Sequence, residues 1–432
     1  MPPDELPYEL VEQIVRKLHF YDLKAVLSLC LVSRAFLTSC QQVIFEKLNL
    51  VHRSPQPLAA ADRLAIPSKF IKLKETLERN PHLVQYVRSV FLMNLGIGDR
   101  TAGAALRCDW VLDNQDFFAE FLGLLEDAPI KTVTLQGEIT GPEFQWGRFA
   151  ENVQSRFYQI FAKGTVERVV FHNVALPTTF FGIFGSAAQE EGGYGGGHLK
   201  EVRLSKICWK DTSESESRLR PQRLQKLEMV TQPSVSADTD LRLLGSPTWL
   251  DLSSVRIFKV MLETSYAHIN RLLAMMGSGL KELYVLVRQC KSGDSILDLS
   301  PLTSLEKLTF AQSMSRASAA NSPIQMKWFA DSLSSLSRPH HSIQSITFEL
   351  ESLRFFNIAT FPTAEPLSTA FATIHQSSNL KSVVIRVTVA RSVLKEQGPE
   401  CAALVNIIRN QVLWLACLDI LDVQVCSNPY PF

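Results

Sequence analysis

Residues whose types and spacing could support catalysis or metal binding are scarce in this 432-residue chain. His340 and His341 are potential metal ligands, but the side chains of adjacent residues diverge, and no cysteine or carboxylate lies at ligand spacing from them. We expect both histidines to occupy a surface turn after Pro339. The H-E-x-x-H, G-x-S-x-G and P-loop patterns are absent. The sequence therefore predicts no catalytic, cofactor-binding or metal-binding residue.

Two polar segments suggest chemistry more weakly. Residues 189–198 hold five glycines, but the G-x-G-x-x-G spacing is missing, and the glycines precede an expected strand instead of joining a strand to a helix. We expect a flexible loop and not a phosphate cradle. Residues 211–218 alternate serine with glutamate, so phosphorylation there would add charge to an acidic loop, although a solvated loop is the simpler expectation. The serines concerned are Ser213, Ser215 and Ser217.

Composition limits the classes of partner and the compartment. The net charge is +1, with 46% hydrophobic and 20% charged residues, so the chain has the balance of a globular protein and no electrostatic signature of nucleic-acid or membrane binding. The N-terminus lacks a signal-peptide pattern, and the most apolar run, residues 412–421, is interrupted by Asp419. The eight cysteines are scattered without a C-x-x-C pair. We expect a soluble protein of the cytoplasm, the nucleus or both.

One short pattern recurs along most of the chain. It consists of an apolar residue, two others, a second apolar residue, one other and a third apolar residue, and its second position is charged or glutamine in every copy. Eleven copies, about 33 residues apart on average, indicate a solenoid. The copies resemble the strand segment of leucine-rich repeats, although the usual Asn or Cys ladder is missing. They begin at Val87, Ile130, Val166, Leu199, Leu224, Val255, Leu280, Leu305, Ile343, Leu380 and Leu418.

Helical segments are expected between several of these strands. Strands that alternate with helices imply parallel pairing through right-handed crossovers. The three intervals of 25 residues leave room only for a turn or a short helix. The expected helices cover residues 114–127, 147–162, 266–276, 325–336, 363–375 and 400–414.

The first 50 residues follow a different pattern. Leu10, Ile14 and Leu18 recur every four residues, as on an amphipathic helix. Asp22 and Ser33 are expected to cap a second and a third short helix. Three helices with so much aliphatic surface form a marginal domain on their own, because units of about 45 residues usually need a metal, disulfides or a partner. The apolar excess therefore points to a partner protein, with an ordinary helical subdomain as the alternative.

The order of these residues resembles an F-box, the segment by which substrate receptors of Skp-cullin-F-box ubiquitin ligases, including fungal ones, dock on a Skp-type adaptor. Many family members carry tryptophan where this chain has Phe36 and Phe45, and we interpret these aromatic replacements as variants. The residues that carry the resemblance are Leu6, Pro7, Glu9, Leu10, Ile14, Leu18, Asp22, Leu23, Leu31, Val32, Ser33, Arg34, Phe36, Phe45 and Leu48.

The resemblance implies an α/β protein with an F-box of three helices (1–50), a linker and connecting helix (51–80) and an irregular leucine-rich-repeat-like solenoid of parallel strands and connecting helices (81–432). It implies a non-enzymatic receptor that binds a Skp-type adaptor, and through it a cullin-RING ligase, together with a protein substrate. An F-box scaffold that does not promote degradation and a motif-poor α/β enzyme are the alternatives. The implied adaptor-binding residues are Leu6, Pro7, Glu9, Leu10, Ile14, Leu18, Leu31, Val32 and Phe36.

A substrate surface is predicted from the strand pattern. Since the apolar positions face the core, the residues between them should project from the opposite, concave face of the sheet. Mixed charge on such a face is commonly only solvated, but Arg and Tyr are frequent in binding hot spots. The predicted substrate-binding residues are Arg203, Lys226, Glu228, Lys259, Glu282, Tyr284 and Lys307.

Overall fold

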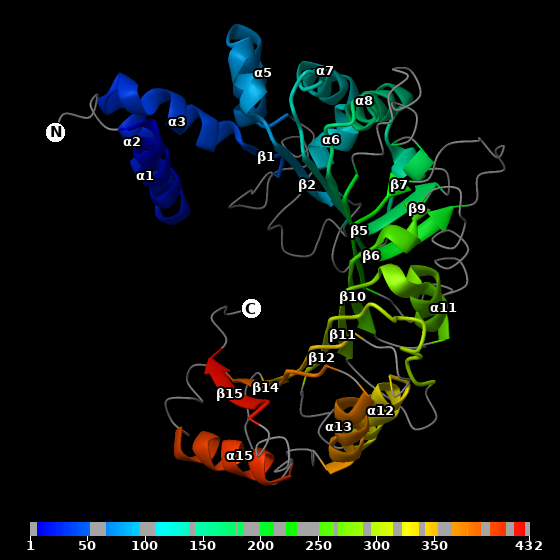
Figure 1. The fold of residues 1–432 in the computed structure, drawn as a ribbon. Coiled ribbons are helices and arrows are strands. Elements are labelled where there is room, and N and C mark those ends of the chain that lie inside the picture. Colours follow the sequence, from blue (N-terminus) through cyan, green and yellow to red (C-terminus); the bar gives the residue numbers. More distant parts are fainter. Residues whose placement is uncertain are drawn as a thin grey trace, which may run out of the picture. The chain divides into compact units, whose positions relative to one another are not determined.

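The structure is a computed structural model (Figure 1), and the chain forms two compact units. The first comprises residues 1–202 and 207–222, and the second comprises residues 203–206 and 223–432. The description covers residues 7–51, 66–95, 109–137, 143–177, 180–182, 184, 199–210, 222–230, 250–262, 267–287, 295–313, 322–336, 342–352, 365–377, 379–389, 398–411 and 419–427. His340, His341 and the predicted loops at 189–198 and 211–218 lie outside these ranges.

The N-terminal segment forms the three predicted helices, α1 (Tyr8–Tyr21), α2 (Leu23–Val32) and α3 (Arg34–Phe45). The Asp22 carboxylate accepts hydrogen bonds from the backbone N–H groups of Lys24 and Ala25 at 2.8 and 3.3 Å, so it caps α2 as expected. Ser33 caps α3 by accepting from the Ala35 N–H at 3.2 Å. Pro7 lies one residue before α1, at the N-cap position.

A short strand that was not predicted joins these helices to the sheet. β1 (Lys47–Asn49) pairs in parallel with β2 (Ser89–Leu95). The Glu46 carbonyl accepts from the N–H groups of Arg88 and Ser89, and the Leu50 N–H donates to the Phe91 carbonyl at 2.9 Å. The boundary predicted at residue 50 therefore coincides with a hydrogen-bonded connection, and α3 leads directly into the first strand of the sheet.

The first unit continues with parallel strands. Its helical elements are α5 (Ser68–Arg79), η2 (Pro81–Tyr86), α6 (Asp109–Asp113), α7 (Gln115–Leu124), η3 (Trp146–Arg148), α8 (Glu151–Ala162) and η4 (Phe180–Gly182). β3 (Thr132–Gly137) lies between β2 and β5 (Arg168–Pro177), and short β4 (Phe144–Gln145) also pairs with β5. β6 (Glu201–Lys210) contributes residues to both units.

In the second unit, the described residues form parallel strands in the order β8, β10, β11, β12, β13, β14 and β15. Their bounds are Lys226–Val230, Ile257–Leu262, Glu282–Val287, Lys307–Ser313, Ser345–Ser352, Ser382–Val389 and Leu421–Ser427. The intervening helical elements are η6 (Leu252–Ser254), α11 (Ala267–Met276), η7 (Gly277–Gly279), α12 (Ser322–Ser334), α13 (Glu365–Ser377) and α15 (Gly398–Gln411). β7 (Gln222–Arg223) and β9 (Leu250–Asp251) pair separately.

Each of the eleven predicted copies contains a strand of the large sheet, and every predicted helix between the copies is present. The apolar positions of neighbouring copies are in register. Leu283 of β11, for example, is the partner of Phe258 in β10 and of Leu308 in β12. The interval of 25 residues between Val255 and Leu280 holds the ten-residue helix α11, where a helix was expected at 266–276.

The charged or glutamine second position has a structural explanation in eight copies of the described chain. There its backbone carbonyl accepts N–H groups from two consecutive residues at the start of the next strand, as the Arg88 carbonyl does from Lys131 and Thr132 at 2.7 and 3.0 Å. Its side chain is exposed or half-buried just before the strand begins, and oppositely charged side chains of neighbouring copies form ion pairs there. Glu167 lies between Lys131 and Lys200, at 3.5 and 3.0 Å. The carbonyl arrangement recurs at Lys131, Glu167, Gln225, Arg256, Lys281, Glu306 and Gln344.

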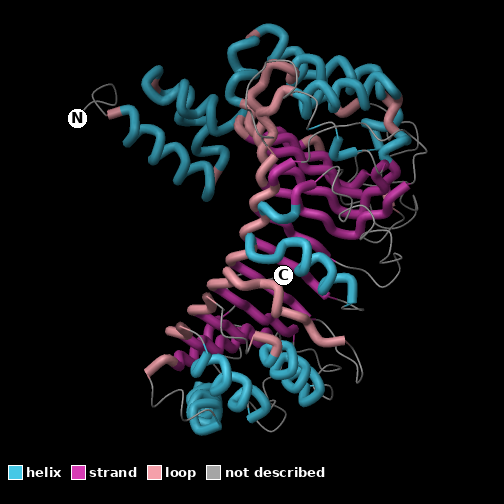
Figure 2. The backbone as a smooth tube through the Cα atoms, turned by 45° about the vertical axis from the view of Figure 1, so that its right-hand side comes forward, coloured by secondary structure: helices cyan, strands magenta, loops and turns pink. Residues whose placement is uncertain are grey.

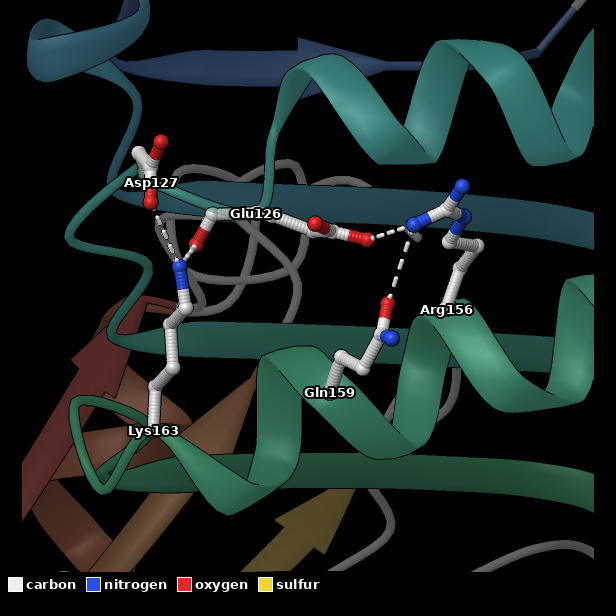
Figure 3. A network of polar contacts seen from close by, with 5 residues as sticks. All are labelled: Glu126, Asp127, Arg156, Gln159 and Lys163. Carbon is white, nitrogen blue, oxygen red and sulfur yellow. Dashed lines mark hydrogen bonds and ion pairs between the residues drawn. The ribbon is translucent and has the colours of Figure 1, made fainter.

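In the first unit, buried aromatic rings fill the space between helices and strands. The ring centres of Phe118 in α7 and Phe157 in α8, for example, are 6.1 Å apart. A polar network joins the same helices at their ends (Figure 3). Lys163 pairs with Asp127 at 2.7 Å, and the Arg156 guanidinium pairs with Glu126. The hydrogen bond from Lys163 lowers the pKa of Asp127 below its ordinary value.

In the second unit, helices lie on one face of the sheet (Figure 2), and contacts between aromatic rings identify that face. The ring centres of Phe310 in β12 and Phe329 in α12 are 4.8 Å apart, and those of Phe348 in β13 and Phe371 in α13 are 5.7 Å apart. Because successive side chains of a strand point to opposite faces, the alternate positions form the face opposite α12 and α13. We call it the open face. It includes Lys226, Glu228, Val230, Ile257, Lys259, Met261, Glu282, Tyr284, Leu286, Lys307, Thr309, Ala311, Glu349, Arg386, Asp422 and Gln424.

Replacing Gly137 by alanine should destabilise the first unit. A Cβ at this end of β3 would lie 2.1 Å from the carbonyl oxygen of Asn173, whose φ is 52°. Such overlap with backbone forces the strands apart, and we expect a cost of about 3 kcal/mol. Gly147→Ala is the control, because its added Cβ would meet nothing within 4 Å. Urea denaturation should separate the variants, and equal midpoints would contradict the close approach of β3 and β5.

Candidate interaction sites

Exposed apolar side chains are concentrated on the three N-terminal helices. Of the thirteen large apolar side chains that are exposed in the described part of the chain, ten lie between Tyr8 and Leu37. Soluble proteins rarely leave contiguous apolar surface uncovered unless it binds something. The N-terminal segment is therefore the strongest candidate for a protein interface in the described structure.

The apolar stripe of α1 divides into two faces. Val11 and Val15 are 2% and 0% exposed and belong to the core of the three helices, with Leu18 packed partly against it. Leu10 and Ile14 point the other way and are 46% and 40% exposed. The sequence predicted a single continuous stripe. The structure assigns one side of that stripe to folding and the other to the surface.

The remaining predicted adaptor-binding residues differ in their exposure to solvent. Leu31 and Val32, at the end of α2, are 89% and 73% exposed. Pro7 and Glu9 are also exposed, whereas Leu6 lies outside the described residues. Phe36 is only 7% exposed and packs in the core with Val26 and Cys40, so its ring supports the helices instead of forming their surface.

Sequence reasoning missed part of this apolar surface. Phe20 and Tyr21, at the end of α1, are each 82% exposed, and their rings meet edge to face at 5.1 Å. Their position outside the four-residue pattern was the available signal. The other exposed apolar residues of these helices outside the predicted adaptor-binding set are Tyr8, Leu23, Leu27 and Leu37.

The cysteines of this segment behave as small apolar residues. Cys40 of α3 is fully buried, and burial, together with its neighbour Cys30 of α2, raises the pKa of its thiol to about 12. A thiol with such a pKa stays protonated at neutral pH and is a poor nucleophile. Both cysteines are free.

The second candidate site lies on the open face, where several predicted substrate residues converge. The Glu228 carboxylate forms ion pairs with Lys226 at 2.9 Å, with Arg203 of β6 at 3.5 Å and with Lys259 at 3.9 Å. Burial by itself would raise the pKa of Glu228, but the three cations outweigh it and hold the pKa below its ordinary value. Glu228 is therefore ionised at neutral pH and orients the cations around it.

Tyr284 extends this cluster across the sheet. The Lys259 ammonium lies 5.8 Å from the centre of the Tyr284 ring, and the Tyr284 hydroxyl donates to Glu349 at 3.2 Å. Arg386 then pairs with Glu349 at 2.7 Å and donates to Gln424 at 3.2 Å. Glu349, Arg386 and Gln424 were not predicted, because these contacts join strands that are 37 to 65 residues apart in the sequence.

The remaining two predicted substrate residues form their own pair. Lys307 of β12 and Glu282 of β11 lie 2.8 Å apart on the open face. The hydrogen bond to Glu282 raises the pKa of Lys307. All seven predicted residues thus project from one face, five in a connected network and two in a separate ion pair.

Within the described ranges, no three His, Cys, Asp or Glu side chains gather closely enough to hold a metal ion. No described helix combines the length and apolar character needed to cross a membrane.

Comparison with known families gives one match. The family model described as "F-box domain" matches residues 3–48, which include α1, α2, α3 and the start of β1. F-box domains bind Skp-type adaptors of cullin-RING ubiquitin ligases. No curated protein matches the chain. The apolar surface around Leu10 and Ile14 thus belongs to an F-box domain, which implies a role in adaptor binding within Skp-cullin-F-box ligases.

Proposed function

We propose that this chain is the substrate-recognition subunit of a Skp-cullin-F-box ubiquitin ligase. Its F-box docks on the adaptor, and its parallel strands form an irregular leucine-rich-repeat-like solenoid whose open face binds a protein substrate. The observation that carries this proposal is the combination of an exposed apolar surface on the F-box with a separate network of polar and aromatic side chains on the open face.

In this function the chain performs no covalent step. Ubiquitin transfer belongs to other subunits, and the receptor raises the effective concentration of a substrate lysine near them. The connection from α3 into β1 supports such positioning, because backbone hydrogen bonds fix the F-box against the first strands. The cytoplasm and the nucleus are the compartments that we propose, in keeping with the free thiols of Cys30, Cys40 and Cys426.

The test is reconstitution of the complete chain with a Skp-type adaptor, a cullin and its RING subunit. Proteins that co-purify with the assembly should increase when the proteasome is inhibited, and they should be ubiquitinated in the reconstituted reaction. An F-box scaffold would bind the adaptor and its clients without ubiquitinating them. A motif-poor α/β enzyme would bind the adaptor and turn over a small molecule without retaining any client protein.

A further inference from the structure

The open face carries an apolar row beside its charged cluster. Val230, Met261, Leu286 and Ala311 are partners in register on β8, β10, β11 and β12. The first three are half-buried, and Ala311 is buried. The row ends where Ala311 meets Glu349, which is paired with Arg386. Four adjacent strands thus present a short apolar strip that spans roughly 14 Å at the usual strand spacing.

Positive charge lies along one side of this strip. Glu228, Lys259 and Tyr284 are partners in the neighbouring row, about 7 Å from the apolar row. Without counting Lys226, two cations, Arg203 and Lys259, still pair with the single Glu228 carboxylate. Their side chains are 50% and 47% exposed. Elsewhere on the face the pairs Lys307–Glu282 and Arg386–Glu349 match one cation with one anion. The cluster around Glu228 therefore keeps a positive excess toward solvent.

The dimensions of the strip select a helical ligand over an extended one. Apolar residues recur about every 5.4 Å along one face of a helix, and every 6.6 Å or so along one face of an extended strand. Neighbouring members of the apolar row are about 4.8 Å apart, so a helix crossing at a tilt of about 27° would match them. A helix about 10 Å wide also brings its flanking side chains over the row that contains Lys259.

We propose that the open face recognises an acidic amphipathic helix in its protein substrate. The apolar side of that helix lies on Val230, Met261, Leu286 and Ala311, and its acidic flank meets Arg203 and Lys259. This inference rests on the proposed function, which it makes specific by naming the chemical class of the substrate segment.

The test is selection from a phage-displayed library of random 16-residue peptides on the complete chain bound to its adaptor. Retained peptides should carry net negative charge, with apolar residues every three or four positions. Synthetic copies should bind more weakly as salt concentration rises. They should lose at least tenfold in affinity toward the double variant Arg203→Glu, Lys259→Glu. A similar loss is expected for Leu286→Gln, which removes the apolar contact without reversing charge.

The matched control reverses two exposed cations on the helices of the same unit. Arg271→Glu with Lys327→Glu changes the net charge equally, on α11 and α12, and should leave affinity within twofold. Neutral or basic peptides, peptides with apolar residues at every second position, or no enrichment would overturn the proposal. So would equal losses in both charge-reversed variants, or retention that requires phosphoserine in a second, phosphorylated library.

The same protein preparations distinguish this inference from the proposed function. If client proteins are captured and ubiquitinated while the selected peptides are not acidic helices, the receptor function stands and the substrate class is wrong. If no client is captured and peptides still bind through Arg203 and Lys259, the open face is a binding surface outside a ligase receptor.

Discussion

Replacing both Leu10 and Ile14 by alanine should weaken adaptor binding by roughly 10- to 1,000-fold while leaving the fold unchanged. Full burial of one such side chain contributes about 1.5 to 3 kcal/mol, and each 1.4 kcal/mol corresponds to about tenfold in affinity. Both side chains are already about half buried in the free chain, at 46% and 40% exposure, which places the expected loss below the sum of two full burials. Calorimetric titration of the adaptor measures the change.

The control is a matched pair on the other side of the same helix. Val11→Ala with Val15→Ala removes side chains that are 2% and 0% exposed, so this variant should melt at a lower temperature, with a loss of about 2 kcal/mol at each site. The Leu10/Ile14 variant should keep the melting temperature of the parent. Undiminished adaptor affinity in that folded variant would show that the exposed side of α1 is not the docking surface.

Arg203→Ala combined with Tyr284→Ala should abolish substrate capture and spare adaptor binding. Arg203 is half exposed and paired with Glu228 at 3.5 Å, and exposed ion pairs of this kind contribute little to stability. The Tyr284 ring lies between Lys259 and Glu349 in the network, so the double variant removes both a guanidinium and the aromatic link of the open face. Quantitative co-purification of client proteins provides the measurement.

Arg256→Ala with Gln344→Ala is the control for this experiment. Both side chains are exposed at the edge of the sheet, where their backbone carbonyls make the interstrand hydrogen bonds that survive substitution. The control should retain every client. If the Arg203/Tyr284 variant also retains the same clients in the same amounts, recognition occurs away from the open face.

The sequence by itself determined the three N-terminal helices, the eleven recurring strands and the helices expected between them, in their order. Apolar spacing at Leu10, Ile14 and Leu18 and capping by Asp22 and Ser33 are local signals, and helices depend mainly on such signals. The eleven-fold strand pattern is equally local, because each copy alternates side chains between two faces within six residues. The charged or glutamine position that recurs in the pattern lies where each strand begins. The sequence shows this position, and only the structure gives the reason for it.

Only the tertiary structure decided which side of each N-terminal helix is available to a partner. Leu10 and Val11 are equivalent in a hydrophobic pattern, yet packing of α1 against α3 buries the valine and exposes the leucine. The three-residue strand β1 is too short to leave a period and exists because β2 supplies its hydrogen bonds. The contacts from Tyr284 to Glu349 and from Glu349 to Arg386 join residues 65 and 37 positions apart, so they depend on strand register, which local spacing does not contain.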